Sequence, residues 1–359
     1  MSSWKEHVRF VEPYVPGEQP KESGIIKLNT NENPYPPAPG VQKVLGELAV
    51  SFDRMRLYPD PNATELTEAI AEMNHVKPSQ VFVGVGSDDV LSMAFLTFFN
   101  GMDPILFPDV TYSFYRVWAD CYRIPYKTIP LTENWEIDSG AYSEKNGGVI
   151  FPNPNAPTGV ALPLKEVRRI LEQNRDVVVI VDEAYIDFGA ESALPLLEEF
   201  DNLLVVQTFS KSRSMAGMRI GFAIGNEKLI RCLSDVRYSV NSYTMNRPSI
   251  AAGTAAMKDE AYFRKTLQKI IDTRDSVKDE LEDMGFFCTD SQTNFLFASH
   301  PEYSAAELYQ KLRERKIYVR YFAQPRIDNY LRITIGTTKQ MQLFLDTLRR
   351  VLREKKDQA

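Results

Sequence analysis

Short apolar runs alternate with amphipathic segments along the first two thirds of the chain. One amphipathic segment begins at Asn62 and places Leu66, Ile70 and Met73 on one helical face, and another begins at Ser87. We expect Asn62 and Ser87 to be the N-caps of these two helices. The apolar runs predict strands over residues 81–85, 104–108, 148–152, 177–182, 203–209 and 219–224. Because these runs are continuously apolar, they indicate an α/β fold in which helices cover both faces of a mainly parallel sheet.

The pattern changes after about residue 245, where one long amphipathic helix precedes a mixed segment. Residues 261–284 form one apolar stripe at helical spacing, and Gly285 ends it. The remainder predicts a smaller α+β domain, with strands at 293–299 and 331–336 and helices at 304–316 and 338–356. Residues 10–40 are rich in proline, glycine and asparagine, which indicates an extended arm. We therefore expect an arm (1–40) that joins the small domain and covers the active site, a large domain (41–260), and a small domain (261–359) entered by the long helix.

Charge and composition narrow the class of ligand and the compartment. The net charge is -6, and acidic and basic residues are interspersed, so the sequence offers no basic face for nucleic acid and no polybasic segment for a membrane. The three cysteines lie far apart and lack metal-ligand spacing, which favours a reducing compartment and no metal site. The amino terminus is charged, and no apolar run of about 18 residues occurs. We expect a cytoplasmic protein that binds a small molecule.

Polar residues follow the predicted strands at their carboxyl ends, where ligands bind in open α/β sheets. Four sets stand at these ends: Gly86, Ser87 and Asp88; Asn155; Asp182 and Tyr185; and Ser210 and Lys211, with Arg219 eight residues further on. Each set alone has an ordinary structural explanation as a helix cap, a turn or an ion pair. Together they match one ligand, a planar heterocycle that carries a phosphate, a ring nitrogen, a phenolic oxygen and an aldehyde.

Pyridoxal phosphate is such a molecule, and each of its groups has a candidate partner. Lys211 can bond the aldehyde, and Asp182 can hold the ring nitrogen in its protonated form. Asn155 and Tyr185 are suited to donate to the phenolic oxygen. The phosphate requires hydroxyls, helix N–H groups and a guanidinium, which are offered by Gly86, Ser87, the backbone of Asp88, Ser210 and Arg219.

The order Asn155, Asp182, Tyr185, Lys211 and Arg219 resembles the fold-type I, pyridoxal-phosphate-dependent aminotransferases of class I and II. Within that superfamily the sequence most resembles the histidinol-phosphate aminotransferases, through the motifs "KLNTNENPYPP", "RLYPDP", "VGVGSDD", "PNPNAPTG", "VDEAY", "TFSKSRSMAGMRIG" and "LRITIGT". The resemblance implies a mainly parallel seven-stranded sheet in a three-layer α/β/α large domain, with a smaller α+β domain. It also implies a homodimer with shared active sites.

The resemblance assigns further site residues. It implies that Tyr112 stacks on the cofactor ring and that Tyr58 reaches the cofactor phosphate of the other subunit. The expected substrate-binding residues are Tyr14 and Asn29 of the arm, with Arg320 and Arg332 of the small domain. Without the resemblance, a surface or structural ion pair is the more ordinary role for the two arginines.

The implied reaction moves an amino group between histidinol phosphate and 2-oxoglutarate, with glutamate as the other product, in histidine biosynthesis. Residues 236–252 depart from the family pattern, so the choice of amino donor stays open. An aromatic amino acid aminotransferase and a threonine-phosphate decarboxylase on the same scaffold are the alternative enzymes. A regulator that binds the cofactor without turnover is disfavoured, because no DNA-binding module fits before residue 62.

Overall fold

The computed structural model describes residues 4–356, and its centre is a seven-stranded sheet. The strand order is β2-β8-β7-β6-β5-β3-β4. Strand β8 runs antiparallel to both of its neighbours, and the other neighbouring pairs are parallel. The strands span Val81–Gly84 (β2), Ile105–Pro108 (β3), Tyr126–Ile129 (β4), Val149–Pro152 (β5), Val179–Asp182 (β6), Leu203–Thr208 (β7) and Gly221–Gly225 (β8). The predicted α/β class and mainly parallel sheet are confirmed.

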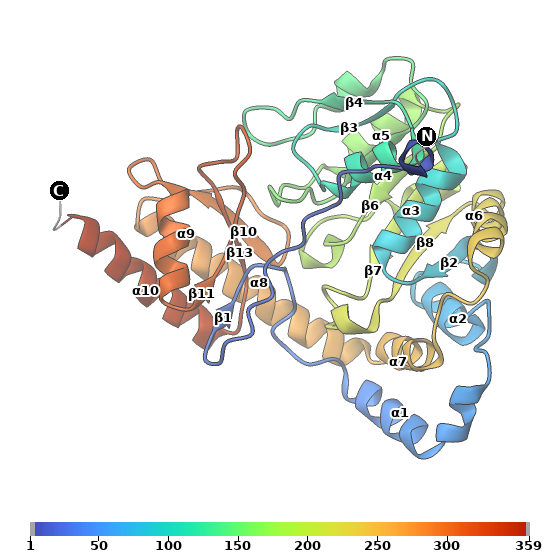
Figure 1. The fold of residues 1–359 in the computed structure, drawn as a ribbon, viewed down its shortest axis with the longest axis horizontal. Helices are drawn as coiled ribbons and strands as arrows, with labels where there is room; N and C mark the ends of the chain where they lie inside the picture. Colours follow the sequence, from blue (N-terminus) through green and yellow to red (C-terminus); the bar gives the residue numbers. More distant parts are fainter. Residues whose placement is uncertain (1–3, 357–359) are drawn as a thin grey trace.

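Helices cover both faces of this sheet, as Figure 1 shows. Alternate strand residues point to opposite faces: Ile150 and Ile180 join a core with helices α3, α4 and α6, whereas Val149 and Val179 join a core with α5. A third core packs α1, α2 and α7 against β2 and β8. The helices span Pro39–Val50 (α1), Thr64–Met73 (α2), Ser87–Phe98 (α3), Phe114–Tyr122 (α4), Leu164–Gln173 (α5), Glu227–Val240 (α6) and Arg247–Met257 (α7). Burial on both faces explains why the strand sequences are continuously apolar.

A smaller α+β part has its own core. Its antiparallel sheet has the order β12-β13-β10-β9, and β1 of the arm pairs in parallel with β11. The strands are Ile26–Lys27 (β1), Phe287–Cys288 (β9), Phe295–Ser299 (β10), Ile317–Tyr318 (β11), Arg320–Tyr321 (β12) and Leu331–Thr334 (β13). The helices are Glu260–Asp283 (α8), Ala305–Glu314 (α9) and Thr338–Lys356 (α10). In Figure 1 the arm, in dark blue, passes from beside α4 to β1 and so connects the two parts.

Local signals explain most of the element boundaries. Helix α8 begins where the Asp259 side chain accepts from the Tyr262 N–H, and it ends just before Gly285, whose φ is 89°. The prediction that Asn62 caps α2 is wrong, because Ala63 occupies the N-cap and the Asp60 carboxylate accepts from the Thr64 N–H at 2.7 Å.

The predicted cap of α3 is also wrong. Gly86 is the N-cap, with a φ of 86°, and Ser87 is already the first helical residue. This exchange matters for the site, because a glycine at the N-cap has no side chain and lets the Arg219 guanidinium lie directly against the helix N-terminus.

Two absences hold for residues 4–356. No helix there is both long and apolar enough to cross a membrane. The same residues contain no cluster of His, Cys, Asp and Glu side chains that could hold a metal ion.

Candidate active site

The predicted phosphate-binding residues converge at the carboxyl end of β7 and the N-terminus of α3. Arg219 Nη1 lies 3.4 Å from Ser210 Oγ, and its Nη2 lies 3.3 Å from Asp88 Oδ2. A Cβ added at Gly86 would collide with the Arg219 guanidinium, and one added at Gly221 would collide with the Gly86 backbone. The site therefore combines a helix N-terminus, a hydroxyl and a guanidinium, and the two glycines allow Arg219 and the start of β8 to pack closely against that helix N-terminus.

Asp182 ends β6 as a buried carboxylate without an ion-pair partner among the described residues. It accepts hydrogen bonds from the Tyr115 hydroxyl at 2.8 Å and from the Ala184 N–H at 3.2 Å. Burial raises its pKa to about 6, although these two donors act in the opposite direction. A carboxylate in this setting gains most from a cation, and a protonated ring nitrogen is one.

Lys211 lies in the loop after β7, beside Tyr185. Its Nζ is 5.6 Å from the centroid of the Tyr185 ring, and no described residue forms a hydrogen bond or an ion pair with that amine. The loop itself is held firmly, because Asn33 Nδ2 donates to the carbonyls of Lys211 and Ser212 at 3.0 and 3.1 Å. The amine is therefore presented by a fixed backbone and is not engaged by a neighbouring residue.

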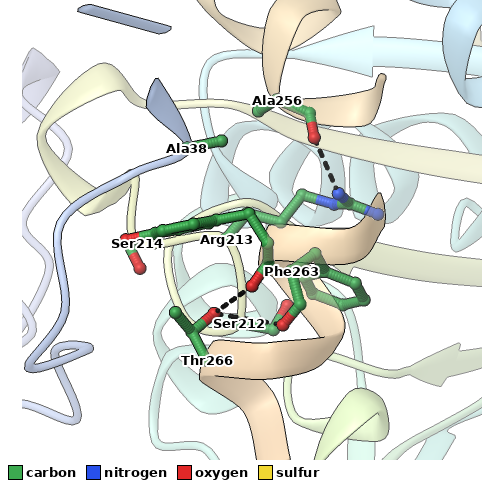
Figure 2. A pocket seen from close by; sticks show the side chains of 8 residues that line it. Ala38, Ser212, Arg213, Ser214, Ala256, Phe263 and Thr266 are labelled. Atoms are coloured by element: carbon green, nitrogen blue, oxygen red, sulfur yellow. Dashed lines mark hydrogen bonds between the residues drawn. The ribbon is translucent and has the colours of Figure 1, made fainter. Parts of the chain in front are cut away.

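A small cavity behind this loop shows a second anchor, Arg213 (Figure 2). Its Nη1 donates to the Ala256 carbonyl at 3.1 Å, and its guanidinium lies 4.2 Å from the Phe263 ring centroid. Burial lowers the Arg213 pKa below its ordinary value. Because it reaches the end of α7 and the start of α8, Arg213 ties the lysine loop to the junction between the two parts of the fold.

Tyr112 and Asn155 lie at the same end of the sheet, with their polar groups already engaged. The Tyr112 hydroxyl donates to Asp88 Oδ1 at 2.7 Å. Burial, followed by the nearby Asp88 carboxylate, raises the Tyr112 pKa well above its ordinary value. Asn155 Nδ2 donates both to the Val110 carbonyl at 3.0 Å and to Thr158 Oγ1 at 2.9 Å.

Arg332 and Arg320 are direct partners across β13 and β12, so both side chains leave the sheet on one face. Arg332 is half-buried and makes few hydrogen bonds: Nη2 donates to the Asn29 carbonyl at 3.2 Å, and the buried Nε has no partner among the described residues. It lies 5.3 and 5.5 Å from the ring centroids of Phe295 and Phe322. Burial lowers its pKa, and no carboxylate of residues 4–356 pairs with it.

The arm delivers Tyr14 and Asn29 to this region. The Tyr14 ring stacks on Phe114 with centroids 4.2 Å apart and lies 6.4 Å from the Tyr112 ring. Asn29 is buried, its Nδ2 donates to the Glu18 carbonyl at 2.8 Å, and its Oδ1 has no partner in the described part of the chain. Tyr14, Tyr112 and Tyr185 all lie close enough to act electrostatically on Arg332, so the arm, the sheet edge and β13 share one site.

Tyr58 is the predicted site residue that the single chain leaves apart. Its ring is 78% exposed and stacks on Tyr243 with centroids 4.5 Å apart, and its carbonyl accepts from Arg247 Nη2 at 3.1 Å. None of these contacts involves another predicted site residue.

Three residues with clear positions in the site were not predicted: Asn31, Asn33 and Tyr115. The repeated asparagines of "NTNENP" gave only a weak signal, because asparagine is ordinary in loops and turns, where its side chain bonds nearby backbone. Tyr115 gave no such signal, since a tyrosine on an apolar helix face is ordinarily part of the core.

The residues present fit pyridoxal phosphate. The buried Asp182 carboxylate forms no ion pair among the described residues, the Lys211 amine forms no hydrogen bond or ion pair there, and the N-terminus of α3 with Ser210 and Arg219 offers donors suited to a phosphate. Each of these features remains incomplete in the chain alone and is complemented by one group of that molecule.

Comparison with known proteins gives one consistent result. The family model described as aminotransferase class I and II matches residues 23–348. Histidinol-phosphate aminotransferase of Lactococcus lactis subsp. cremoris (strain SK11) is 50% identical over 353 residues, which is 98% of this chain and 99% of that protein. The protein of the same name from Acinetobacter baumannii (strain SDF) is 52% identical over 353 residues, with 97% of both chains covered.

The solved structures agree on the fold. A crystal structure of histidinol-phosphate aminotransferase from Sinorhizobium meliloti in complex with pyridoxal-5'-phosphate is similar with a TM-score of 0.83 and 23% identity. The match covers 92% of this chain and 91% of that one. The chain therefore belongs to the aminotransferase class I and II family and, within it, to the histidinol-phosphate aminotransferases.

Proposed function

We propose that this protein uses pyridoxal phosphate to transfer an amino group between L-histidinol phosphate and 2-oxoglutarate, as a step of histidine biosynthesis. The relatives at about 50% identity over nearly the whole chain support the transaminase activity. The observation that carries the substrate class is Arg332, a half-buried arginine whose buried Nε is unpaired within residues 4–356, beside Arg320. Both substrates carry an anionic group close to the reacting carbon, a phosphate in one and a carboxylate in the other, and a planar guanidinium can bind either through two hydrogen bonds.

Pyridoxal phosphate, when bound, supplies the aldehyde that carries the amino group and the ring that accepts electron density from the reacting carbon. Lys211 Nζ would hold the aldehyde group of the cofactor, and the same amine would move the proton at the reacting carbon. Asp182 would keep the ring nitrogen protonated, while Arg219, Ser210 and the backbone from Gly86 to Asp88 would bind the phosphate. Tyr185 and Asn155 would serve the phenolic oxygen, and Tyr112 would pack against the ring.

Tyr14 and Asn29 close over the substrate from the arm, which already lies against Phe114 and Arg332. This role supports the division of the chain into an arm and two domains, with boundaries near residues 40 and 260. A closed arm excludes water from the reacting carbon and strengthens the electrostatic contacts around it.

The active unit is a homodimer with shared sites, in which Tyr58 contacts the cofactor phosphate held by the other subunit. The exposed apolar side chains near it, Phe52, Leu57 and Tyr243, support a protein-covered face. A cytoplasmic location is consistent with a biosynthetic enzyme of this kind, and the partners are small molecules rather than nucleic acid or membrane.

The direct test is to mix the holoprotein separately with histidinol phosphate, phenylalanine and threonine phosphate. Only histidinol phosphate should change the cofactor's absorbance rapidly and yield its keto product when 2-oxoglutarate is supplied. Conversion of phenylalanine alone would make the protein an aromatic aminotransferase, and release of carbon dioxide from threonine phosphate would make it a decarboxylase.

A further inference from the structure

Asn31, in the arm between β1 and α1, lies at the centre of a buried hydrogen-bond network. Its backbone N–H donates to Thr334 Oγ1 of β13 at 3.0 Å, and its carbonyl accepts from Asn294 Nδ2 at 2.9 Å. Its side-chain Nδ2 lies 2.8 Å from the Tyr185 hydroxyl. The residue is 1% exposed and has a φ of 54°, a left-handed conformation that asparagine adopts more readily than most residues. One residue of the arm thus connects the small-domain sheet to Tyr185.

The hydroxyl proton of Thr334 fixes which end of the Asn31 amide faces Tyr185. Thr334 Oγ1 accepts the Asn31 N–H, and its own proton goes to Asn31 Oδ1, 3.0 Å away. The amide oxygen therefore faces Thr334, and the amide nitrogen faces Tyr185. Because Asn31 Nδ2 donates to Tyr185 Oη, the Tyr185 hydroxyl accepts on that side and its proton points elsewhere.

The Tyr185 ring is held on its other sides as well. It packs edge-on against Phe295 with centroids 5.2 Å apart, and Lys211 Nζ lies 5.6 Å from its centroid. Arg332 is the second cation close enough to interact with Tyr185. Rotation of the hydroxyl is therefore the main freedom left to this side chain, and Asn31 restricts it.

Asn155, the other candidate donor to the cofactor's phenolic oxygen, has both amide hydrogens engaged by the Val110 carbonyl and Thr158 Oγ1. Tyr185 has a proton without an acceptor in the described residues, at the edge where Lys211 stands. A hydroxyl that accepts one hydrogen bond is also a stronger donor of its own proton.

We propose that Asn31 is a positioning residue that aims the Tyr185 hydroxyl proton at the phenolic oxygen of the cofactor. The inference rests on the proposed function, because it needs pyridoxal phosphate bound at Lys211. Since Asn31 belongs to the arm and is fixed by Thr334 of β13, the seating of the arm on the small domain sets the quality of this hydrogen bond.

The test is a pH titration of the holoenzyme's visible absorbance without substrate, in Asn31→Asp, Tyr185→Phe and the double variant. The carboxylate that Asn31→Asp introduces would accept from the Tyr185 hydroxyl and turn its proton away from the cofactor. The Tyr185 proton stabilises the anionic phenolic oxygen most when the nitrogen that joins Lys211 to the cofactor is unprotonated. Loss of this hydrogen bond therefore raises the pH midpoint of the absorbance change. We expect Asn31→Asp to raise the midpoint by roughly half a pH unit more in the Tyr185 background than in the Tyr185→Phe background.

The Tyr185→Phe background is the matched control, because there only the through-space effect of the new charge remains. Equal shifts in the two backgrounds, or no shift, would overturn the role of Asn31 while Tyr185→Phe alone still raises the midpoint and the proposed function stands. A Tyr185→Phe midpoint equal to that of the wild type would remove the role of Tyr185 together with that of Asn31. If Asn31→Asp does not fold, Asn31→Gly suits the positive φ and enters the same cycle, with a smaller shift expected in the same direction.

Discussion

Replacing Asp182 by asparagine should stabilise the protein without its cofactor, although the same change should impair catalysis. Burial raises the pKa of Asp182 from 3.8 to about 6, so the folded state holds that proton more tightly than the unfolded chain. The raised pKa stabilises the folded state fully below pH 3.8, where the carboxyl is protonated. This contribution to the free energy of unfolding is lost as pH rises from 3.8 to about 6, and the loss is complete above that range. Asp182 thus destabilises the cofactor-free protein by about 3 kcal/mol at pH 8 and by about half as much at pH 5.

Asparagine has nearly the same shape as aspartate and no charge to bury. It can also keep both contacts, because the Tyr115 hydroxyl can accept where it now donates, while the Ala184 N–H still meets the amide oxygen. The measurement is urea unfolding of cofactor-free wild type and Asp182→Asn at pH 5 and pH 8, at one protein concentration. We expect the variant to be the more stable at both values, with its advantage larger at pH 8 by roughly 1–2 kcal/mol.

Glu183 is the natural concern in this experiment, since burial raises its pKa to about 7 in the same range. It is present in both proteins, so its contribution cancels in the difference between them. An advantage that does not change between pH 5 and pH 8, or a variant less stable than wild type at pH 8, would refute the reasoning. With pyridoxal phosphate in excess, wild type should gain more stability than the variant, because only the carboxylate pairs with the protonated ring nitrogen.

Three further experiments probe separate parts of the site. Arg332→Lys should raise KM for both substrates by roughly 10- to 100-fold with a smaller change in kcat, since lysine cannot form two parallel hydrogen bonds to an anion; unchanged KM values in steady-state assays would argue against the assignment. Arg219→Lys should weaken cofactor binding about 10-fold or more, measured by fluorescence titration of the cofactor-free protein, and equal affinity would contradict its phosphate contact. Mixed refolding of Tyr58→Ala and Lys211→Ala should restore about a quarter of wild-type activity, because half of the dimers then carry one intact shared site. A mixture no more active than its components would mean that the sites are not shared.

The sequence predicted the site where strand direction determines position. Asp182 and Lys211 follow apolar runs that become the parallel strands β6 and β7, so their placement at one sheet edge follows from the fold class. Arg219 is less direct, because β8 runs antiparallel and presents its start at that edge. Its identification depended on the surrounding motif rather than on the strand rule.

Other features depend on contacts that no local pattern contains. Asn31 meets Tyr185 across 154 positions, and Tyr115 meets Asp182 across 67. Strand β4, Tyr126–Ile129, was not predicted, because an edge strand exposes Lys127 and lacks a continuous apolar run. Strands β9, β11 and β12 of the small part have two residues each, which is too short to show an alternation of apolar and polar residues.

Polar atoms that folding leaves unpaired indicate where the chain expects something else to bind. Two buried charged residues with a structural role have several hydrogen-bond partners each. The Glu183 carboxylate accepts from Ser192, Ala193 and Gln207, and Arg274 donates to two carbonyls and to Asp275. Most buried side-chain atoms without a partner in the described residues fall into two groups. The first group lies at the proposed substrate site: Asn29 Oδ1, Asn294 Oδ1 and Arg332 Nε. The second lies around Tyr58 and Tyr243: Arg237 Nε, Thr244 Oγ1 and Arg247 Nε. Each unpaired group of this kind costs about 1–3 kcal/mol, which a single folded chain has no reason to retain unless a partner restores it. Arg332 Nε is a donor that a substrate anion would satisfy, and Arg247 Nε belongs to the side chain that contacts the Tyr58 carbonyl on the proposed subunit face, so one physical criterion supports both proposals independently of the motifs.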